Sequence, residues 1–174
     1  YDFLYPNPAS VLAFIENHDT DRFLGEGNNL PMLKQASTLL LTTRRIPQLY
    51  YGTEVMMNGV KSKSDGYVRK DFPGGWTGDA TNALTPAGRT KIQNECYDFY
   101  KTILNWRKGN DVIAKGSMVQ FMVQNGVYAY ARQYEGKTIF VMLNGTDAET
   151  TVPLKFYKEI LKDSKQGKDI LSGK

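Results

Sequence analysis

The chain has 174 residues, of which 41% are hydrophobic and 12% aromatic, and its formal net charge is +4. This composition excludes an intrinsically disordered chain, and the length suits one domain or one domain with a smaller second one. The longest apolar stretch, residues 36–43, is too short to span a bilayer. No basic motif interleaved with aromatic residues indicates nucleic-acid binding, and the single cysteine, Cys96, excludes an internal disulfide.

The first predicted element is a short buried strand over residues 11–15, which ends abruptly in polar residues. A buried parallel strand delivers side chains to a site at its C-terminal end. Here those side chains include His18, the only histidine of the chain, and the adjacent Asp19. A hydrogen-bond donor beside a carboxylate suits the binding of sugar hydroxyls.

A helix and a second strand follow. Asn29 can cap a helix that has Pro31 in its first turn and runs to about Thr43. Residues 46–52 predict the second strand, so that strand, helix and strand form a βα–β unit with parallel strands. Two parallel strands alone cannot bury both faces, and we therefore expect partner strands from elsewhere. The apolar face of the helix is predicted to comprise Met32, Ala36, Leu39 and Leu40.

A long glycine-rich loop over residues 56–84 leads to a second helix. Thr85 and Pro86 predict its start, and Gly109 predicts its end near Lys108. Its buried stripe is predicted to consist of Ile92, Cys96, Phe99, Tyr100, Ile103 and Trp106.

Beyond Asn110 the spacing of the apolar residues changes from a helical repeat to the alternation that is typical of strands. The pattern predicts an antiparallel β-sandwich over residues 111–174, preceded by a separate domain over residues 1–110. Glu135 to Lys137 form a predicted turn between two strands. The expected strands cover residues 112–123, 127–134, 138–143, 149–154, 160–161 and 169–171.

The segment after the first strand resembles a short motif of the α-amylase family of glycoside hydrolases, Phe-x-x-Asn-His-Asp-x-x-Arg. It matches at Phe14, Asn17, His18, Asp19 and Arg22. Residues 47–54 resemble the eighth-strand segment of that family and residues 104–107 its eighth barrel helix. Residues 69–76 resemble a loop of neopullulanase- and cyclomaltodextrinase-like members. The resemblance implies the last two βα units of a TIM barrel in residues 1–110, with the family's C-terminal β domain after them.

The resemblance also implies roles for single residues. Asp19 is expected to stabilise the transition state, with Arg22 as structural support. Asn17, His18, Phe72 and Trp76 are expected to bind substrate. The alternatives from the residues alone are an Asx turn at Asp19, a structural histidine at His18, and loop packing for Phe72 and Trp76.

The family's nucleophile and general acid belong to motifs that precede this one, and only thirteen residues precede Phe14. We therefore expect the C-terminal part of a retaining hydrolase of maltodextrins, cyclodextrins, pullulan or starch, inactive by itself. The expected partners are an α-glucan and either the missing part of the barrel or a second copy of the chain. A truncated family member that has lost catalysis is a further alternative.

A rival hypothesis concerns the alternating tyrosines Tyr128, Tyr130 and Tyr134, which would stack an oligosaccharide in a non-catalytic glucan-binding module. The simpler interpretation is packing of a half-buried sheet. One Cys and one His cannot form a zinc site, so no cofactor is expected in this segment. The resemblance allows calcium in the whole protein, with ligands outside this segment. Localisation is not readable from the residues, although glucan hydrolases of this kind are often exported.

Overall fold

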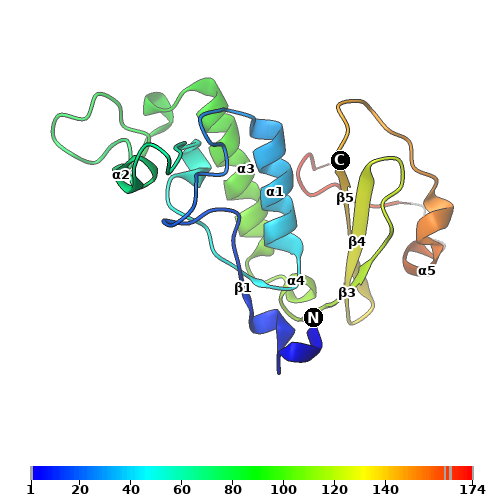
Figure 1. Ribbon diagram of the computed structural model, residues 1–174. Helices are drawn as coiled ribbons and strands as arrows, with labels where there is room; N and C mark the ends of the chain where they lie inside the picture. Colours follow the sequence, from blue (N-terminus) through cyan, green and yellow to red (C-terminus); the bar gives the residue numbers. More distant parts are fainter. Residues whose placement is uncertain (1, 163, 165, 174) are drawn as a thin grey trace. The chain divides into compact units, whose positions relative to one another are not determined.

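The computed structural model describes residues 2–162, 164 and 166–173, and the chain divides into two compact units (Figure 1). Unit 1 comprises Tyr1–Leu41 and Arg45–Asn105, and unit 2 comprises Thr42–Arg44 and Trp106–Lys174. No helix in the described part of the chain has the length and apolar character needed to cross a bilayer.

Unit 1 contains two short parallel strands, β1 (Leu12–Ala13) and β2 (Ile46–Pro47), joined through helix α1 (Leu30–Thr42). The backbone N of Ile46 donates to the Val11 carbonyl at 3.1 Å, and the N of Gln48 donates to the Ala13 carbonyl at 2.8 Å. The predicted parallel pairing is confirmed, but each strand has only two residues. Leu12 is 52% exposed and Ile46 49% exposed, so this sheet leaves apolar side chains uncovered.

Helix α1 begins where the sequence predicts it, because Asn29 Oδ1 accepts from the backbone N of Met32 at 3.0 Å and Pro31 lies in the first turn. The predicted apolar face is wrong at Met32, which is 45% exposed. The helix instead buries a face that includes Ser37, whose hydroxyl bonds to that of Tyr100. The fully covered residues of this face are Leu30, Leu33, Ser37, Leu40 and Leu41.

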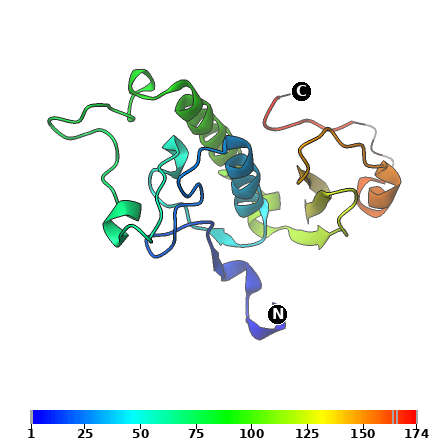
Figure 2. The same cartoon turned by 45° about the horizontal axis from the view of Figure 1, so that its top comes forward.

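Helix α3 (Lys91–Arg107) lies beside α1, as the blue and green helices of Figure 2 show. The predicted start at Thr85 is wrong: Thr85 caps a single 3₁₀ turn (Pro86–Gly88). The helix begins after Thr90, whose hydroxyl accepts from the backbone N of Gln93 while Gln93 Oε1 accepts from the backbone N of Thr90. This reciprocal capping box is the stronger start signal.

The end of α3 and most of its stripe are confirmed. Gly109 has a φ of +74°, which suits a left-handed helix terminus. Two residues predicted for the buried stripe are not fully buried, since Ile92 is 37% exposed and Trp106 is half-buried. Its buried members are Cys96, Phe99, Tyr100 and Ile103. Within the long loop, Asp65–Val68 forms one short helix, α2.

Unit 2 contains a three-stranded antiparallel sheet in the order β3 (Ser117–Gln120), β4 (Val127–Tyr134) and β5 (Lys137–Asn144). The β4–β5 turn is the predicted one. Glu135 and Gly136 both have positive φ, +47° and +75°, which is the geometry of a two-residue type I′ hairpin.

Several expected strands of unit 2 are absent from the described residues. Asn110 caps helix α4 (Asp111–Lys115) where a strand was expected, because its side chain accepts from the backbone N of Ile113. The strand expected at 160–161 is instead in helix α5 (Lys158–Leu161). Residues 149–153 are irregular, and 170–172 form a turn. Short apolar runs do not separate strand from helix, and the described residues contain one sheet here rather than the expected two-sheet sandwich.

The core of unit 2 is organised around two buried polar side chains of β4. Tyr130 is fully buried and its hydroxyl bonds to that of Thr42; burial raises the pKa of Tyr130 to about 12. The tyrosine strip considered as a rival glucan-binding face is therefore interrupted at Tyr130, which packs in the core. Arg132 is 1% exposed and donates to four carbonyls, those of Thr42, Ile113, Gly116 and Ser117, at 2.7–3.3 Å.

The Arg132→Ala variant is expected to lose about 3 kcal/mol of unfolding free energy, because four buried carbonyls lose their donor at once. Urea denaturation followed by circular dichroism measures this loss. The neighbouring Gln133→Ala variant is the matched control and is expected to change stability by less than about 1 kcal/mol. An equal loss of unfolding free energy in Arg132→Ala and Gln133→Ala would contradict the role of Arg132 in the core.

Cys96 is expected to be inert in the folded protein. Its thiol is fully buried, it donates to the Thr53 carbonyl at 3.6 Å, and burial raises its pKa to about 12. A chromogenic disulfide reagent at pH 8 should react with one thiol per chain in denaturant and with none without it. Rapid reaction of the native chain would contradict this burial.

Candidate functional site

The candidate site is the turn that follows β1, at the edge of the sheet where β2 also ends. Asn17 shapes this turn. Its Oδ1 accepts from the backbone N of Asp19 at 2.7 Å, and its own N donates to Thr20 Oγ1 at 3.0 Å. The Asx turn considered for Asp19 is thus made by Asn17, and the carboxylate of Asp19 stays outside the turn.

His18 and Asp19 lie together on the surface of this turn. His18 Nε2 is 3.2 Å from Asp19 Oδ2, and the two side chains are 59% and 62% exposed. The pair therefore presents an imidazole and a carboxylate to solvent at one place, as the sequence predicts.

The long loop supplies cations to the same place. Arg69 donates through Nε to the His18 carbonyl at 2.9 Å and through Nη2 to Asp19 Oδ1 at 3.1 Å. The same Nη2 lies 3.1 Å from Asp65 Oδ2. Lys61 donates to the Asp19 carbonyl at 3.1 Å and lies 3.3 Å from Asp65 Oδ1. Asp19 is thus held from two sides, by His18 and by Arg69.

Arg22 lies beneath this surface and is 1% exposed. Its Nε donates to the Val68 carbonyl at 3.0 Å and its Nη1 to the Tyr51 carbonyl at 2.7 Å. The guanidinium carbon also lies 3.9 Å from the centre of the Tyr50 ring. Arg22 therefore supports backbone carbonyls rather than the Asp19 carboxylate.

Glu16 is the counter-ion of Arg22. It is 2% exposed, its Oε1 lies 3.4 Å from Arg22 Nη1, and it also accepts from the backbone N of Phe23 and the hydroxyl of Thr53. Three donors around one carboxylate satisfy a charge that would otherwise be costly to bury. Burial is also the main cause that raises the pKa of Tyr50, the ring that Arg22 covers.

Phe72 and Trp76 lie farther along the long loop. Phe72 is half-buried and Trp76 is 70% exposed, with its backbone N bonded to Asp79 Oδ2 at 2.9 Å. In the described part of the chain, no hydrogen bond or ring contact joins either residue to His18 or Asp19. The exposure of Trp76 shows that it is not packed against the rest of unit 1.

Sequence reasoning assigns no role to Arg69, Lys61 or Glu16, although the structure makes them part of the site. A signal for Arg69 was present, because it opens the segment 69–76 that carries part of the family resemblance. No group of three or more His, Cys, Asp or Glu side chains suited to a metal ion occurs among the described residues. The arrangement can bind neutral polyhydroxyl molecules through a fixed carboxylate and an adjacent imidazole.

Comparison with known proteins relates the chain to starch-active enzymes. Residues 118–174 match the cyclo-malto-dextrinase C-terminal domain family. An alpha-amylase of Niallia circulans is 29% identical over 177 residues, which cover 97% of this chain and 30% of that protein. A cyclomaltodextrin glucanotransferase of Thermoanaerobacterium thermosulfurigenes is 31% identical over 159 residues, 87% of this chain and 20% of that protein.

Solved structures show the same relationship. The gamma-CGTase of alkalophilic Bacillus clarkii aligns with a TM-score of 0.62 and 27% identity, over 85% of this chain and 20% of that chain. The chain therefore spans only 20–30% of the length of these relatives.

Arg22 and Lys61 both belong to the site, but only Arg22 is buried. The Arg22→Ala variant is expected to lose about 3–5 kcal/mol of unfolding free energy, because Glu16 would remain buried without its counter-ion. Lys61→Ala is the matched control and should cost less than about 1 kcal/mol, since its ion pair with Asp65 is exposed to solvent. Urea denaturation compares the two, and an Arg22→Ala variant as stable as the control would refute the supporting role.

Proposed function

We propose that this chain, which belongs to the α-amylase family of glycoside hydrolases, carries the transition-state-stabilising carboxylate of a retaining α-glucan hydrolase. Asp19 is that carboxylate, and His18 donates a hydrogen bond to the same sugar. The nucleophile and the general acid come from a part of the enzyme outside this chain. The chain alone is therefore catalytically inactive.

One observation carries this proposal: Asp19 is 62% exposed, yet both of its oxygens are held, by His18 at 3.2 Å and by Arg69 at 3.1 Å. Glu16, by contrast, is 2% exposed and is surrounded by protein donors. A carboxylate that is fixed and still open to solvent suits a ligand with hydroxyl donors.

The chemistry of the reaction explains why such a group is needed. Glycoside cleavage passes through an oxocarbenium-like transition state, and hydrogen bonds to ring hydroxyls that strengthen there contribute several kcal/mol. A carboxylate held in place before the substrate arrives provides this stabilisation without rearranging during the reaction. Asn17 takes part by fixing the turn, and Arg22 by fixing the backbone beneath it.

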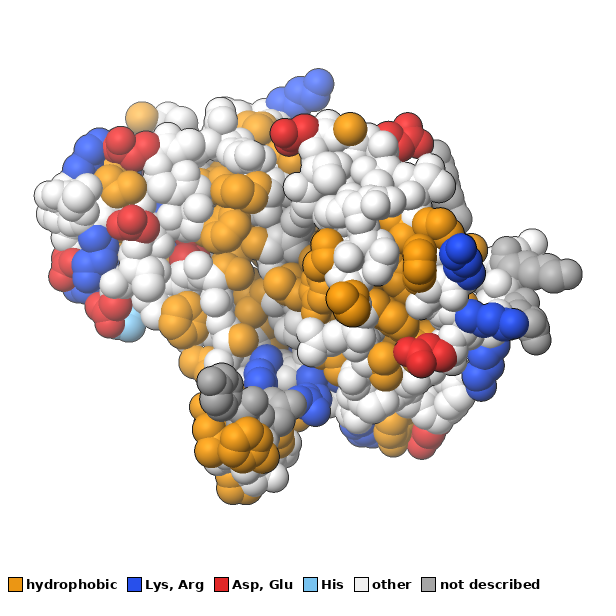
Figure 3. Space-filling view, turned by 45° about the vertical axis from the view of Figure 1, so that its right-hand side comes forward, with side chains coloured by type: hydrophobic (Ala, Val, Ile, Leu, Met, Phe, Trp, Pro, Cys, Tyr) orange, Lys and Arg blue, Asp and Glu red, His pale blue; other side chains and the backbone are white. Residues whose placement is uncertain are grey.

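The fold proposed for the whole enzyme is a TIM barrel, with β1 and β2 as its seventh and eighth strands. Two observations support it: β1 and β2 pair in parallel through a helix, and their apolar side chains are half exposed. Hydrophobic side chains, orange in Figure 3, remain on the surface of the molecule. The exposed apolar residues near the chain's start include Phe3, Leu4, Leu12 and Phe14, at 84%, 62%, 52% and 44%. The remaining barrel strands, or a second copy of the chain, would cover them.

The proposed substrates are maltodextrins, cyclodextrins, pullulan or starch. The names of the relatives support α-glucans in general, and the match at residues 118–174 supports an enzyme related to cyclomaltodextrinase. We further propose that Phe72 and the exposed Trp76 form the wall of a sugar subsite in a neopullulanase-like loop.

The test combines binding and hydrolysis by the 174-residue chain. Calorimetric titration with maltoheptaose is expected to show binding that Asp19→Asn weakens about 10- to 100-fold, because a charge-assisted hydrogen bond of about 1.5–3 kcal/mol is lost. Asp98→Asn, which changes an exposed carboxylate of α3, is the matched control and should bind like the parent chain.

Reducing-sugar release from maltodextrin, cyclodextrin and pullulan is expected to be absent for the chain and for all variants. Release that disappears in Asp19→Asn would show a complete catalytic site within these 174 residues and refute the division of carboxylates proposed here. Unchanged maltoheptaose affinity in Asp19→Asn would remove Asp19 from the sugar contact.

A further inference from the structure

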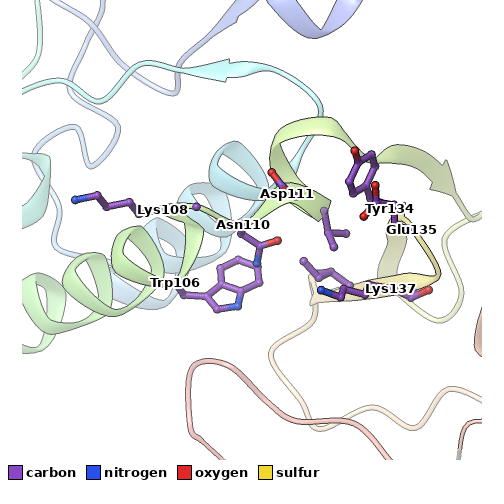
Figure 4. A pocket seen from close by; sticks show the side chains of 11 residues that line it. Trp106, Lys108, Asn110, Asp111, Tyr134, Glu135 and Lys137 are labelled. Atoms are coloured by element: carbon purple, nitrogen blue, oxygen red, sulfur yellow. The ribbon is translucent and has the colours of Figure 1, made fainter.

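Unit 2 contains a hollow beside Trp106 that the proposed function does not use. Its volume is about 480 Å³, within the range of ligand sites. Figure 4 shows that Trp106 reaches it from the last turn of α3, Asn110 from the cap of α4, and Tyr134, Glu135 and Lys137 from the β4–β5 hairpin. Its walls are linked by Arg132 of β4, which donates to the carbonyls of Ile113 in α4 and of Gly116 just after it.

Two further hollows have lining residues in common with this one. One of about 720 Å³ shares Trp106, Thr138 and Ile139 with it, and one of about 380 Å³ shares Tyr134, Glu135 and Lys137. Residues of the β4–β5 hairpin thus line all three hollows, and the first of them, beside Trp106, is the groove at Trp106.

The charged residues that line the first hollow indicate which kind of ligand it can bind. Lys108 and Lys137 contribute two positive charges, and Asp111 and Glu135 contribute two negative ones. Asp111 is also paired with Lys115 at 3.0 Å. A balanced lining gives no net attraction for an anion such as a nucleic acid or for a cation, but it offers both donors and acceptors to a neutral polar molecule.

Trp106 supplies the apolar contact. It is half-buried at the surface, in contrast to the buried Tyr100 and Ile103 of the same helix. An indole ring in a polar hollow binds molecules that have one apolar face and a hydrogen-bonding edge, and the pyranose ring is such a molecule. The amide of Asn110 and the hydroxyl of Thr138 line the hollow around it.

We propose that the groove at Trp106, formed entirely by residues of unit 2, binds a neutral α-glucan oligosaccharide. The choice of an α-glucan rests on the proposed function, whereas the neutral and partly apolar character of the ligand follows from the lining of the groove itself. Such a site shares no residue with the turn that carries His18 and Asp19.

The chain has two tryptophans, so Trp76→Phe leaves Trp106 as its only indole fluorophore. Titration of this variant with maltoheptaose is expected to change the Trp106 emission saturably. In this background Glu135→Ala and Lys137→Ala, both at the exposed turn, should each raise the dissociation constant about 2- to 10-fold by removing one hydrogen-bonding group. Unaltered emission at saturating maltoheptaose would overturn the proposal.

A second variant separates this site from the first. Asp19→Asn in the same Trp76→Phe background is expected to leave the Trp106 response unchanged, and its loss would overturn the second site. In the parent chain, calorimetry should find two maltoheptaose sites, and Trp106→Ala should reduce them to one, with folding checked by circular dichroism. If the parent shows one site that Asp19→Asn weakens, the groove proposal fails and the proposed function stands.

Discussion

The candidate site depends on one buried ion pair, between Arg22 and Glu16. Arg22 bonds to the carbonyls of Tyr51 and Val68, so that one side chain joins the turn after β1, the end of β2 and the long loop. The bond to Val68 has a direct consequence, because the next residue is Arg69, which holds Asp19. The position of the exposed carboxylate is thus determined by a charge buried several residues away.

Unit 1 contains two arginine–carboxylate ion pairs that differ in solvent exposure and therefore in their contribution. The Arg22–Glu16 pair has side chains that are 0% and 2% exposed. The Arg69–Asp19 pair has side chains that are 39% and 62% exposed. Exposed pairs contribute about 0–1 kcal/mol to stability, so the outer pair adds little to folding and leaves a carboxylate that a ligand can reach. The buried pair holds the backbone around the turn in place. The exposed pair orients a carboxylate that remains accessible to a ligand.

Local signals explain which parts could be predicted from sequence. The pairing of β1 with β2, the start of α1 at Asn29 and the β4–β5 turn at Gly136 follow from patterns within a few residues, and the structure has them. Helices α4 and α5 were missed because their short apolar runs fit a strand equally well, and only the Asn110 cap favours a helix at α4. Arg69 was missed for another reason: it lies 50 residues from Asp19, and no local pattern specifies a contact at that separation.

The geometry at Asp19 leaves room for the sugar contact proposed for it. A carboxylate offers about four acceptor positions on its two oxygens. Arg69 occupies one position on Oδ1, and His18 approaches Oδ2. About two positions therefore remain, and the 62% exposure of the side chain leaves them open to solvent. Neighbouring hydroxyls of a glucosyl residue can donate to both. Because the protein's own groups orient the carboxylate when the chain folds, a ligand that binds there does not have to order this side chain.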